Sequence, residues 1–357
     1  MTIVTVIGAR PQFIKCAPVS REIRVFAKEI LIHTGQHYDD TMSDSFFRDL
    51  GLPRPDHNLG VGSGSHGAQT GAMLTGIERV LEKSKPDTVL VYGDTNSTLA
   101  GALAAVKLNL PVAHVEAGLR SFERRMPEEI NRIVTDHVST ILFPPTKTAV
   151  KNLDDEGIRK GVHLVGDVMY DALRHNIKIA RVESKVLNRL ELKPGGYLLA
   201  TIHRAGNTDD AEKLGGILTA LSELGSAERP VLFPVHPRTG KMLSKTTVPA
   251  GAGLKFTNPA SYLDMLHLEE NAAAILTDSG GVQKEAFWLG VPCITLRQET
   301  EWVETVEAGA NRIAGTGRDG IIRAVADALA APRPKPGEDI GNGRAAAGIA
   351  RILAEST

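Results

Sequence analysis

Three acidic residues lie in the first half of the chain in segments that could do proton-transfer chemistry: Asp94 in VYGDTNSTLAG, Glu116 in HVEAGLRS and Glu128 in MPEEINR. Taken alone, Asp94 is also typical of a helix cap, which accepts backbone N–H groups. Carboxylates that converge and lose part of their water have raised proton affinities, which acid–base chemistry near neutral pH requires. We therefore expect these three residues to form a catalytic carboxylate cluster.

Cationic residues accompany the acids. GARPQFIK puts Arg10 in the turn after the first expected strand and Lys15 one turn into a helix, where both can reach a phosphate. A cation at a helix start is unfavourable without an anionic partner, which favours a binding role for Arg10 over a solvated helix start. Arg132 follows Glu128 by four residues on a helix that Pro127 would begin, so this pair could also be a surface salt bridge.

The second half of the chain contains a Ser-Gly-Gly turn, Ser279, Gly280 and Gly281, between an expected strand and a helix. A helix start leaves backbone N–H groups unpaired and carries the positive end of the helix dipole. Glycine there lets a phosphate approach the backbone, although it also serves close packing alone. The turn predicts a phosphate or diphosphate site.

Two strand ends in the second half carry a histidine with an arginine, His203 in ATIHRAGN and His236 in FPVHPRT. A metal site is the rival explanation, but the histidines lack metal-ligand spacing and the neighbouring arginines repel a cation. We therefore expect anion recognition and no metal.

Short β-branched runs alternate with helical patterns along the whole chain, which is typical of a parallel, doubly wound sheet. The pattern runs from Thr2–Gly8 to a last first-half strand at Val162–Asp167, and then restarts at Tyr197. We expect an α/β protein with two Rossmann-like domains facing across a cleft. The expected domains are residues 1–168 and 169–335, with a final helix in residues 336–357 packing back on the first domain. Ligands of such sheets bind outside the carboxyl ends of the strands, where the polar residues lie.

The length and composition of the 357 residues fit an ordinary soluble globular protein of two domains. A net charge of −1 offers no general attraction for nucleic acid or an anionic membrane. Cys16 and Cys293 match neither a metal site nor a disulfide framework. The start TIVTVIGA is too short for a signal-peptide core, and no apolar run reaches membrane-spanning length. We expect a cytoplasmic location.

Together the motifs resemble one family, the non-hydrolysing UDP-N-acetylglucosamine 2-epimerases, which share the glycosyltransferase-B architecture. The resemblance covers nearly the whole chain in order, through GARPQFIK, GDTNSTLAG, HVEAGLRS, MPEEINR, the His203 motif, VHPR, TDSGGVQKEA and TEWVE. It implies interconversion of UDP-GlcNAc and UDP-ManNAc, in which UDP is eliminated to leave a 2-acetamidoglucal and is then added back. It implies no cofactor and a homodimer.

The resemblance also assigns roles to single residues. Asp94, Glu116, Glu128 and His203 match the catalytic residues, with base and acid left open. Arg10, Lys15, Ser279, Gly280 and Gly281 match positions that contact the diphosphate and sugar, Glu285 matches the carboxylate that binds the ribose hydroxyls, and Tyr262 and Met265 lie where the uracil contacts are built. We add Arg132, His236 and Trp302 to the expected substrate-binding residues.

Departures from the family pattern affect the expected substrate. Trp302-Val303 stands where many bacterial members have Arg-Pro, Gly206 replaces a usual glutamate, and His37–Asp44 replaces a segment of a second, activating UDP-GlcNAc site, so we expect no such activation. The ARPQFIK and TEWVE variants look most like the branch that epimerises UDP-2,3-diacetamido-2,3-dideoxyglucuronate, an O-antigen precursor. That substrate is the leading alternative; a glycosyltransferase, a hydrolysing epimerase and a nucleotide-sugar sensor are weaker ones.

Overall fold

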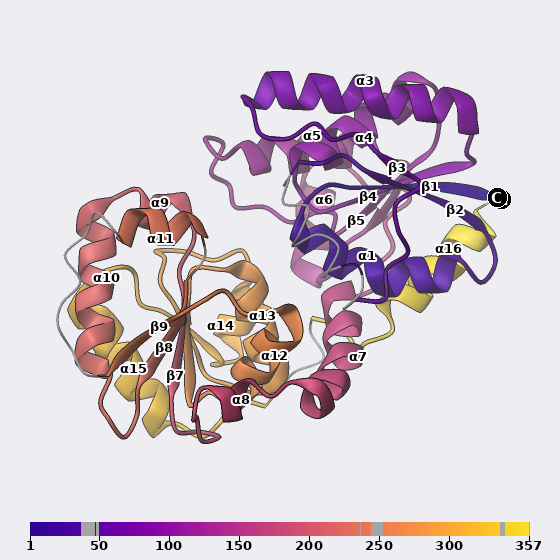
Figure 1. The fold of residues 1–357 in the computed structure, drawn as a ribbon. Helices are drawn as coiled ribbons and strands as arrows, with labels where there is room; N and C mark the ends of the chain where they lie inside the picture. Colours follow the sequence, from indigo (N-terminus) through magenta and orange to yellow (C-terminus); the bar gives the residue numbers. More distant parts are fainter. Residues whose placement is uncertain (37–46, 48–49, 236, 244–252, 336–339, 357) are drawn as a thin grey trace. The chain divides into compact units, whose positions relative to one another are not determined.

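The computed structural model describes residues 1–36, 47, 50–235, 237–243, 253–335 and 340–356. The chain divides into two compact units (Figure 1): unit 1 is Met1–Arg174 with Glu338–Thr357, and unit 2 is His175–Gly337. The division falls inside helix α7, Val168–Glu183, whose sequence VMYDALRHNIKIARVE contains no glycine or proline that would interrupt it.

In the described part of unit 1, six parallel strands form one sheet in the order β3-β2-β1-β4-β5-β6. The strands are β1 Thr2–Ile7, β2 Lys28–His33, β3 His57–Asn58, β4 Thr88–Tyr92, β5 Val112–Val115 and β6 Ile141–Phe143. Strands such as TIVTVI are β-branched and almost continuously buried, as expected when helices cover both faces of a parallel sheet.

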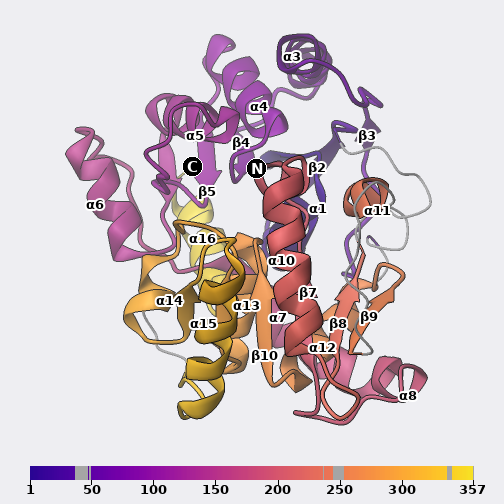
Figure 2. The same ribbon diagram turned by 90° about the vertical axis from the view of Figure 1, so that its left-hand side faces the viewer.

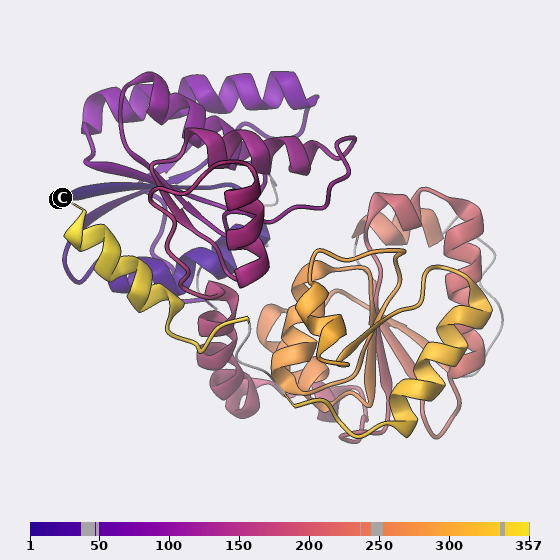
Figure 3. The same cartoon turned by 180° about the vertical axis from the view of Figure 1, so that it is seen from behind.

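The helices of unit 1 lie on both faces of its sheet. They are α1 Arg10–Ile23, α3 His66–Ser84, α4 Asn96–Lys107, α5 Pro127–Val138, α6 Lys147–Asp155 and the C-terminal α16 Ala345–Glu355. Helix α16 packs along α1, and α3, α4 and α5 pack in sequence on the opposite face (Figures 1 and 3). Asp171 of α7 accepts the backbone N–H groups of Ala345 and Ala346 at 3.2 and 3.1 Å, which satisfies the first turn of α16.

The strand expected at Val162–Asp167 is wrong. Val162 forms only an isolated bridge with Leu142, and the segment leads directly into α7. Gly161 and Gly166 have φ values of 69° and 90°, a left-handed conformation that interrupts an extended ladder. The structure instead adds the two-residue β3, which the sequence did not predict.

In the described part of unit 2, six parallel strands form a second sheet in the order β12-β11-β10-β7-β8-β9. The strands are β7 Leu198–Thr201, β8 Val231–Pro234, β9 Leu254–Thr257, β10 Ala274–Thr277, β11 Cys293–Thr295 and β12 Asn311–Ile313. The helices are α8 Val186–Arg189, α9 Ala205–Thr208, α10 Ala211–Leu224, α11 Pro237–Leu243, α12 Tyr262–Asn271, α13 Gly280–Leu289, α14 Val303–Glu307 and α15 Arg318–Ala330.

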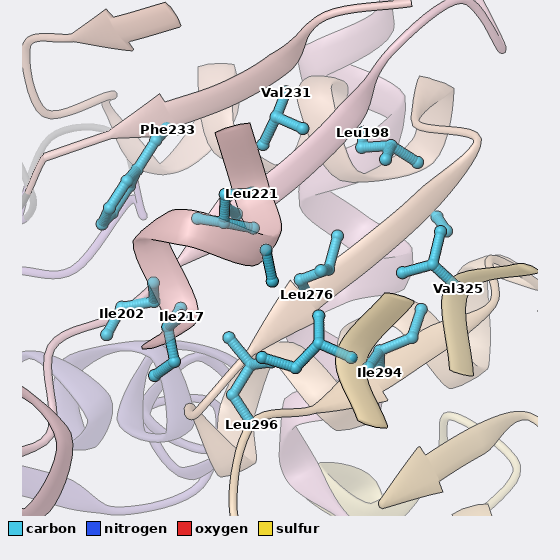
Figure 4. Packing of buried hydrophobic residues seen from close by; sticks show 14 of the residues in the cluster. Leu198, Ile202, Ile217, Leu221, Val231, Phe233, Leu276, Ile294, Leu296 and Val325 are labelled. Atoms are coloured by element: carbon cyan, nitrogen blue, oxygen red, sulfur yellow. The ribbon is translucent and has the colours of Figure 1, made fainter. Parts of the chain in front are cut away.

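The main core of unit 2 lies between its sheet and the helix pair α10 and α15, which pack against each other (Figure 2). Its members include Leu198, Phe233, Leu276 and Ile294 from the strands and Leu221 from α10 (Figure 4). Burying one such side chain contributes about 1.5–3 kcal/mol, so the layer holds the strand ends in fixed register. Those strand ends carry the candidate residues.

Candidate active site

In unit 1, the ends of β4 and β5 place Asp94 and Glu116 next to each other. Tyr92 and Val115 are register partners in the parallel sheet, so the residues that follow them leave the same edge together. Glu116 has φ 73°, a left-handed conformation that is rare outside glycine. Such backbone strain persists where surrounding contacts hold it and is enriched at active sites.

Lys15 of α1 forms an ion pair with Glu116, and both side chains are only 9% exposed. Gly93 makes room for the pair, because a Cβ atom there would lie 3.3 Å from both Glu116 Oε2 and Lys15 Nζ. A buried carboxylate with a cationic partner is favoured in its charged form. The structure thus brings together Lys15 and Glu116, two of the predicted site residues.

Asp94 is bound by Arg132, whose guanidinium is also bound by Glu129. Arg132 Nη1 lies 2.5 Å from Asp94 Oδ2, while Nη2 and Nε donate to Glu129 Oε2 at 2.6 and 2.8 Å. Glu129, three residues before Arg132 on the same helix, is buried, whereas Glu128 is exposed. Glu129 is a residue that the sequence reasoning missed.

The proton affinity of Asp94 is raised by its surroundings. Burial raises the pKa of Asp94 most, Arg132 and Lys15 lower it, and the negative charges of Glu116 and Glu128 raise it further, leaving it above its ordinary value. Asp94 therefore interacts electrostatically with both of the other predicted catalytic carboxylates of unit 1. The Asp94 side chain remains 35% exposed, which leaves its carboxyl accessible to a ligand.

The GARPQ turn before α1 is organised by Gln12. Its Oε1 accepts the backbone N–H groups of Gly8 and Ala9 at 2.7 and 3.1 Å, and its Nε2 donates to the carbonyl of Tyr92 at 2.8 Å. A glutamate could not donate that last bond. Arg10 is the first residue of α1 and is partly buried.

A histidine that the sequence did not single out supports the same strand ends. His114 is fully buried in β5, with Nδ1 2.7 Å from Asp136 Oδ1 and Nε2 2.7 Å from the carbonyl oxygen of Gly93. Burial would raise the pKa of Asp136, but His114 and Arg120 outweigh it and hold that pKa below its usual value. This charged network ties β5 to the turn that carries Asp94.

In unit 2, His203 follows β7 and faces the buried Asp278, with His203 Nδ1 3.2 Å from Asp278 Oδ1. Asp278 also accepts the backbone N–H of Arg204 at 3.0 Å and the side-chain amide of Asn207 at 3.1 Å. Burial would raise the pKa of Asp278, but the donors from His203 and Arg204 outweigh it and lower that pKa. Asp278 fixes the orientation of the predicted catalytic histidine, of which 41% is exposed.

The Ser-Gly-Gly turn lies at the start of α13 in unit 2. Ser279 is the N-cap, and its hydroxyl accepts the backbone N–H of Val282. Gly280 and Gly281 are the first helical residues, so their N–H groups have no acceptor within the helix. The geometry suits an anion, as the sequence predicts.

Glu285 lies one and a half turns further along α13 and is buried with Tyr262. The Tyr262 hydroxyl donates to Glu285 Oε1 at 3.4 Å. Burial, followed by the charge of Glu285, raises the pKa of Tyr262 well above its usual value. Met265 is partly buried and packs against the apolar cluster behind α13.

Trp302 is buried beside an ion network that the sequence did not reveal. Glu301 binds Arg297 through two hydrogen bonds of 2.8 and 2.9 Å, and Arg204 lies 3.6 Å away from it. Burial would raise the pKa of Glu301, but the two arginines lower it to about 2. The network of Arg204, Arg297 and Glu301 therefore contains two cationic side chains and one carboxylate.

Some predicted features lie outside the described residues, namely His236 and the segment 37–46. Within the described ranges, no group of three or more His, Cys, Asp or Glu residues is placed to hold a metal ion. Across the same residues, no helix has both the length and the apolar character needed to cross a membrane.

Comparison with known proteins gives consistent results. The sequence model of the UDP-N-acetylglucosamine 2-epimerase family matches residues 22–354. The UDP-N-acetylglucosamine 2-epimerase homolog of Methanococcus maripaludis is 57% identical, over 90% of this chain and 91% of its own. The UDP-2,3-diacetamido-2,3-dideoxy-D-glucuronate 2-epimerase of Pseudomonas aeruginosa is 49% identical, over 99% of this chain and 100% of its own.

A solved structure agrees with these relatives. The crystal structure of Methanocaldococcus jannaschii UDP-GlcNAc 2-epimerase in complex with UDP-GlcNAc and UDP is 46% identical, covers 99% of this chain and 100% of its own, and has a TM-score of 0.92. The chain therefore belongs to the UDP-N-acetylglucosamine 2-epimerase family, a family of UDP-sugar 2-epimerases, hence isomerases, with a two-domain glycosyltransferase-B-like fold.

Proposed function

We propose that this chain interconverts UDP-GlcNAc and UDP-ManNAc by eliminating and re-adding UDP. The observation that supports this most is the carboxylate cluster, in which Asp94, Glu116 and Glu128 interact and each of the first two has its own cation. A non-catalytic UDP-sugar sensor would not require such carboxylates.

The reaction is demanding because the C2 proton of the sugar has no adjacent carbonyl to acidify it. A base removes that proton while the C1–O bond breaks, so the electron pair of C2–H forms the C1=C2 double bond and UDP leaves with its own pair. In the second step UDP attacks C1 again, and C2 receives a proton on the opposite face. Two proton-transfer groups on different faces of the sugar are needed.

The side chains of unit 1 suit the proton transfers. The raised pKa of Asp94 brings it closer to the range in which a carboxyl both takes up and gives up protons. Glu116 forms an ion pair with Lys15, and the exposed Glu128 completes the cluster. We assign His203, held by Asp278, to the same reaction and leave open which group is base and which is acid.

The side chains of unit 2 suit retention of the leaving group. Gly280, Gly281 and the Ser279 hydroxyl would bind the diphosphate, and Glu285 would bind the ribose hydroxyls. Tyr262 and Met265 would flank the uracil. The remaining substrate contacts that we propose are Arg10, Lys15, Arg132, His236 and Trp302. Elimination requires that UDP leave the sugar without leaving the enzyme, which makes firm diphosphate binding part of the mechanism.

A second substrate is supported by a specific observation. The Pseudomonas aeruginosa diacetamidoglucuronate epimerase matches essentially the whole chain at 49% identity. The UDP-N-acetylglucosamine 2-epimerase of Methanococcus maripaludis matches at 48%. UDP-2,3-diacetamido-2,3-dideoxyglucuronate is therefore the alternative substrate.

One assay separates these possibilities. The enzyme is incubated with each UDP-sugar alone and the products are followed by NMR. UDP-ManNAc from UDP-GlcNAc supports the first proposal, and turnover of the diacetamidoglucuronate alone supports the second. Free UDP with free sugar indicates a hydrolysing enzyme, and no reaction with either substrate contradicts both. Asp94→Asn and Glu116→Gln should keep UDP binding and lose turnover; lost binding with an unstable fold would indicate structural caps instead.

We also infer a homodimer located in the cytoplasm. The family resemblance supports the dimer, and nucleotide-sugar substrates support the location. Light scattering of the purified protein should give twice the chain mass of 38.2 kDa. A monomer mass at all concentrations, or recovery of the native enzyme in an extracytoplasmic fraction, would contradict these assignments.

A further inference from the structure

Lys284 lies buried between the two tryptophans of the chain, Trp288 and Trp302. Its side chain is 1% exposed, and its Nζ lies 3.9 Å from the ring centroid of Trp302 and 5.8 Å from that of Trp288. An ammonium group removed from water needs favourable electrostatic contacts, and the face of an indole ring provides one. Lys284 therefore lies against the face of the Trp302 ring.

The edge of the Trp302 ring reaches the start of α13. A Cβ atom at Gly280 would lie 3.0 Å from Trp302 Nε1, so the indole nitrogen sits directly over the glycine. Trp302 is 4% exposed, and among the described residues its indole N–H makes no hydrogen bond. A buried indole N–H normally finds a partner. The Trp302 Nε1 atom therefore lies beside the start of α13, where the N–H groups of Gly280 and Gly281 have no acceptor within the helix.

The charged side chains around Gly280 favour an anion there. Glu301 Oε2 would lie 3.8 Å from a Cβ atom at Gly280, and a lone carboxylate there would repel a phosphate. Glu301 is however bound by Arg297 and faced by Arg204, so its charge is more than offset. Lys284 adds a further positive charge behind the Trp302 ring.

We propose that Trp302 donates its indole N–H to a diphosphate oxygen of UDP bound at Ser279–Gly281, and that Lys284 is the positioning residue that holds this donor in place. The proposal rests on the proposed UDP-sugar function. The hydrogen-bond donor and the positive charge are then supplied by different residues: the N–H comes from Trp302, and the charge comes from the Lys284 ammonium on the ring face.

The two tryptophans allow a direct test. ¹⁵N-labelled protein gives two indole N–H resonances, and Trp288→Phe identifies the one from Trp302. On saturation with UDP, the Trp302 resonance should move downfield, as expected for a new hydrogen bond to a charged oxygen, and the Trp288 resonance should move much less. An unchanged Trp302 resonance in wild-type protein saturated with UDP overturns the proposal.

Affinity measurements give a second, independent readout by calorimetry with UDP. Trp302→Phe keeps an aromatic ring at this position but removes the N–H, and should weaken UDP binding roughly 10- to 100-fold, the loss expected for a hydrogen bond to a charged group. Lys284→Met should also weaken binding and broaden the Trp302 indole resonance, whereas Lys284→Arg should restore much of both. Trp288→Phe is the matched control and should bind UDP like wild type.

A wrong function and a wrong role for Trp302 would give different results. If wild-type protein binds no UDP, the proposed function is wrong. If wild type binds UDP and Trp302→Phe binds it equally well, only the role of Trp302 is wrong. If a variant does not fold, the resonance shift in wild-type protein still decides the question.

Discussion

Arg132 and Asp94 are joined by a 2.5 Å contact from Nη1 to Oδ2, and the rest of the same guanidinium is held by Glu129. Glu129 is 1% exposed and its pKa is lowered: burial alone would raise it, but backbone N–H groups of the loop at Ser121 and the Arg132 side chain outweigh that effect. The buried Glu129 thus positions Arg132, and Arg132 positions Asp94, a partly exposed catalytic candidate. Besides its proposed substrate contact, Arg132 therefore acts on the reaction through Asp94.

Arg132→Lys should lower kcat by about 100-fold, because a lysine has no planar fork and cannot bind Glu129 and Asp94 in the same geometry. UDP binding should weaken much less than kcat falls. Steady-state kinetics and UDP calorimetry check this. Arg125→Lys, at an exposed position before the same helix, is the control and should behave as wild type. Equal kinetics of the two variants would contradict the positioning role.

Asp278→Asn should reduce both turnover and stability. In the asparagine, an NH₂ group would replace one of the oxygens that accept the N–H groups of His203 and Arg204. Buried donors would then be left unsatisfied, at a cost of about 1–3 kcal/mol. The free energy of unfolding and kcat are the measurements. Asp319→Asn, whose side chain is 78% exposed, should change stability by less than about 0.5 kcal/mol. A fully active Asp278→Asn enzyme would show that His203 needs no carboxylate partner.

Removing the carboxyl of Glu269 in α12 should raise stability, in contrast to the loss expected for Asp278→Asn. It is fully buried, and in the described residues neither carboxyl oxygen has a hydrogen-bond partner. Burial, followed by the charge of Glu285, raises the pKa of Glu269 well above its usual value. Because the folded state keeps this proton while the unfolded state loses it, Glu269 makes folding less favourable as pH rises above its unfolded pKa.

Glu269→Leu should therefore raise the free energy of unfolding at pH 7 by about 1–3 kcal/mol, since it removes an unsatisfied buried polar group. The adjacent Glu270→Gln removes only an exposed ion pair with Arg181 and should lower stability by about 0–1 kcal/mol. Chemical denaturation of both variants measures this. If Glu269→Leu lowers stability as much as a cavity in the core does, the carboxyl has a structural partner.

The pH dependence of stability should carry a contribution from Glu301. Its folded pKa of about 2 lies below the ordinary value of 4.5, so it stabilises the fold above the unfolded pKa. That contribution, at most about 3 kcal/mol, is lost as the pH falls from 4.5 through 2. Unfolding free energies of wild type and Glu301→Gln between pH 2 and 6 test this: the wild-type curve should fall more steeply, and parallel curves would contradict it.

The doubly wound sheets were predictable from the sequence because strands buried on both faces form apolar runs with polar residues at their carboxyl ends. Asp94 and Glu116 illustrate this, since each directly follows such a run. The errors occurred where the local pattern is ambiguous. Val162–Asp167 has the β-branched character of a strand, but the conformation of its flanking glycines ends the pairing. The short β3 and β12 offer too few residues for any periodicity.

The side-chain partners were harder to predict than the site residues. Spacing alone allows Arg132 to pair with either Glu128 or Glu129, and only the burial of Glu129 decides between them. Lys284 and Trp302 lie eighteen positions apart by their numbering, and their contact depends on how α13 and the start of α14 pack. Such contacts between elements leave no signal in the local sequence.

The central claim is that the enzyme inverts C2 by removing and returning a proton through an elimination. UDP-GlcNAc incubated with the enzyme in D₂O and followed by ¹H NMR and mass spectrometry tests it most directly. We predict UDP-ManNAc that carries one deuterium at C2, with UDP still bonded to the sugar at equilibrium. UDP-ManNAc that retains its original C2 proton, or release of free UDP with free N-acetylmannosamine as the end products, would contradict the account.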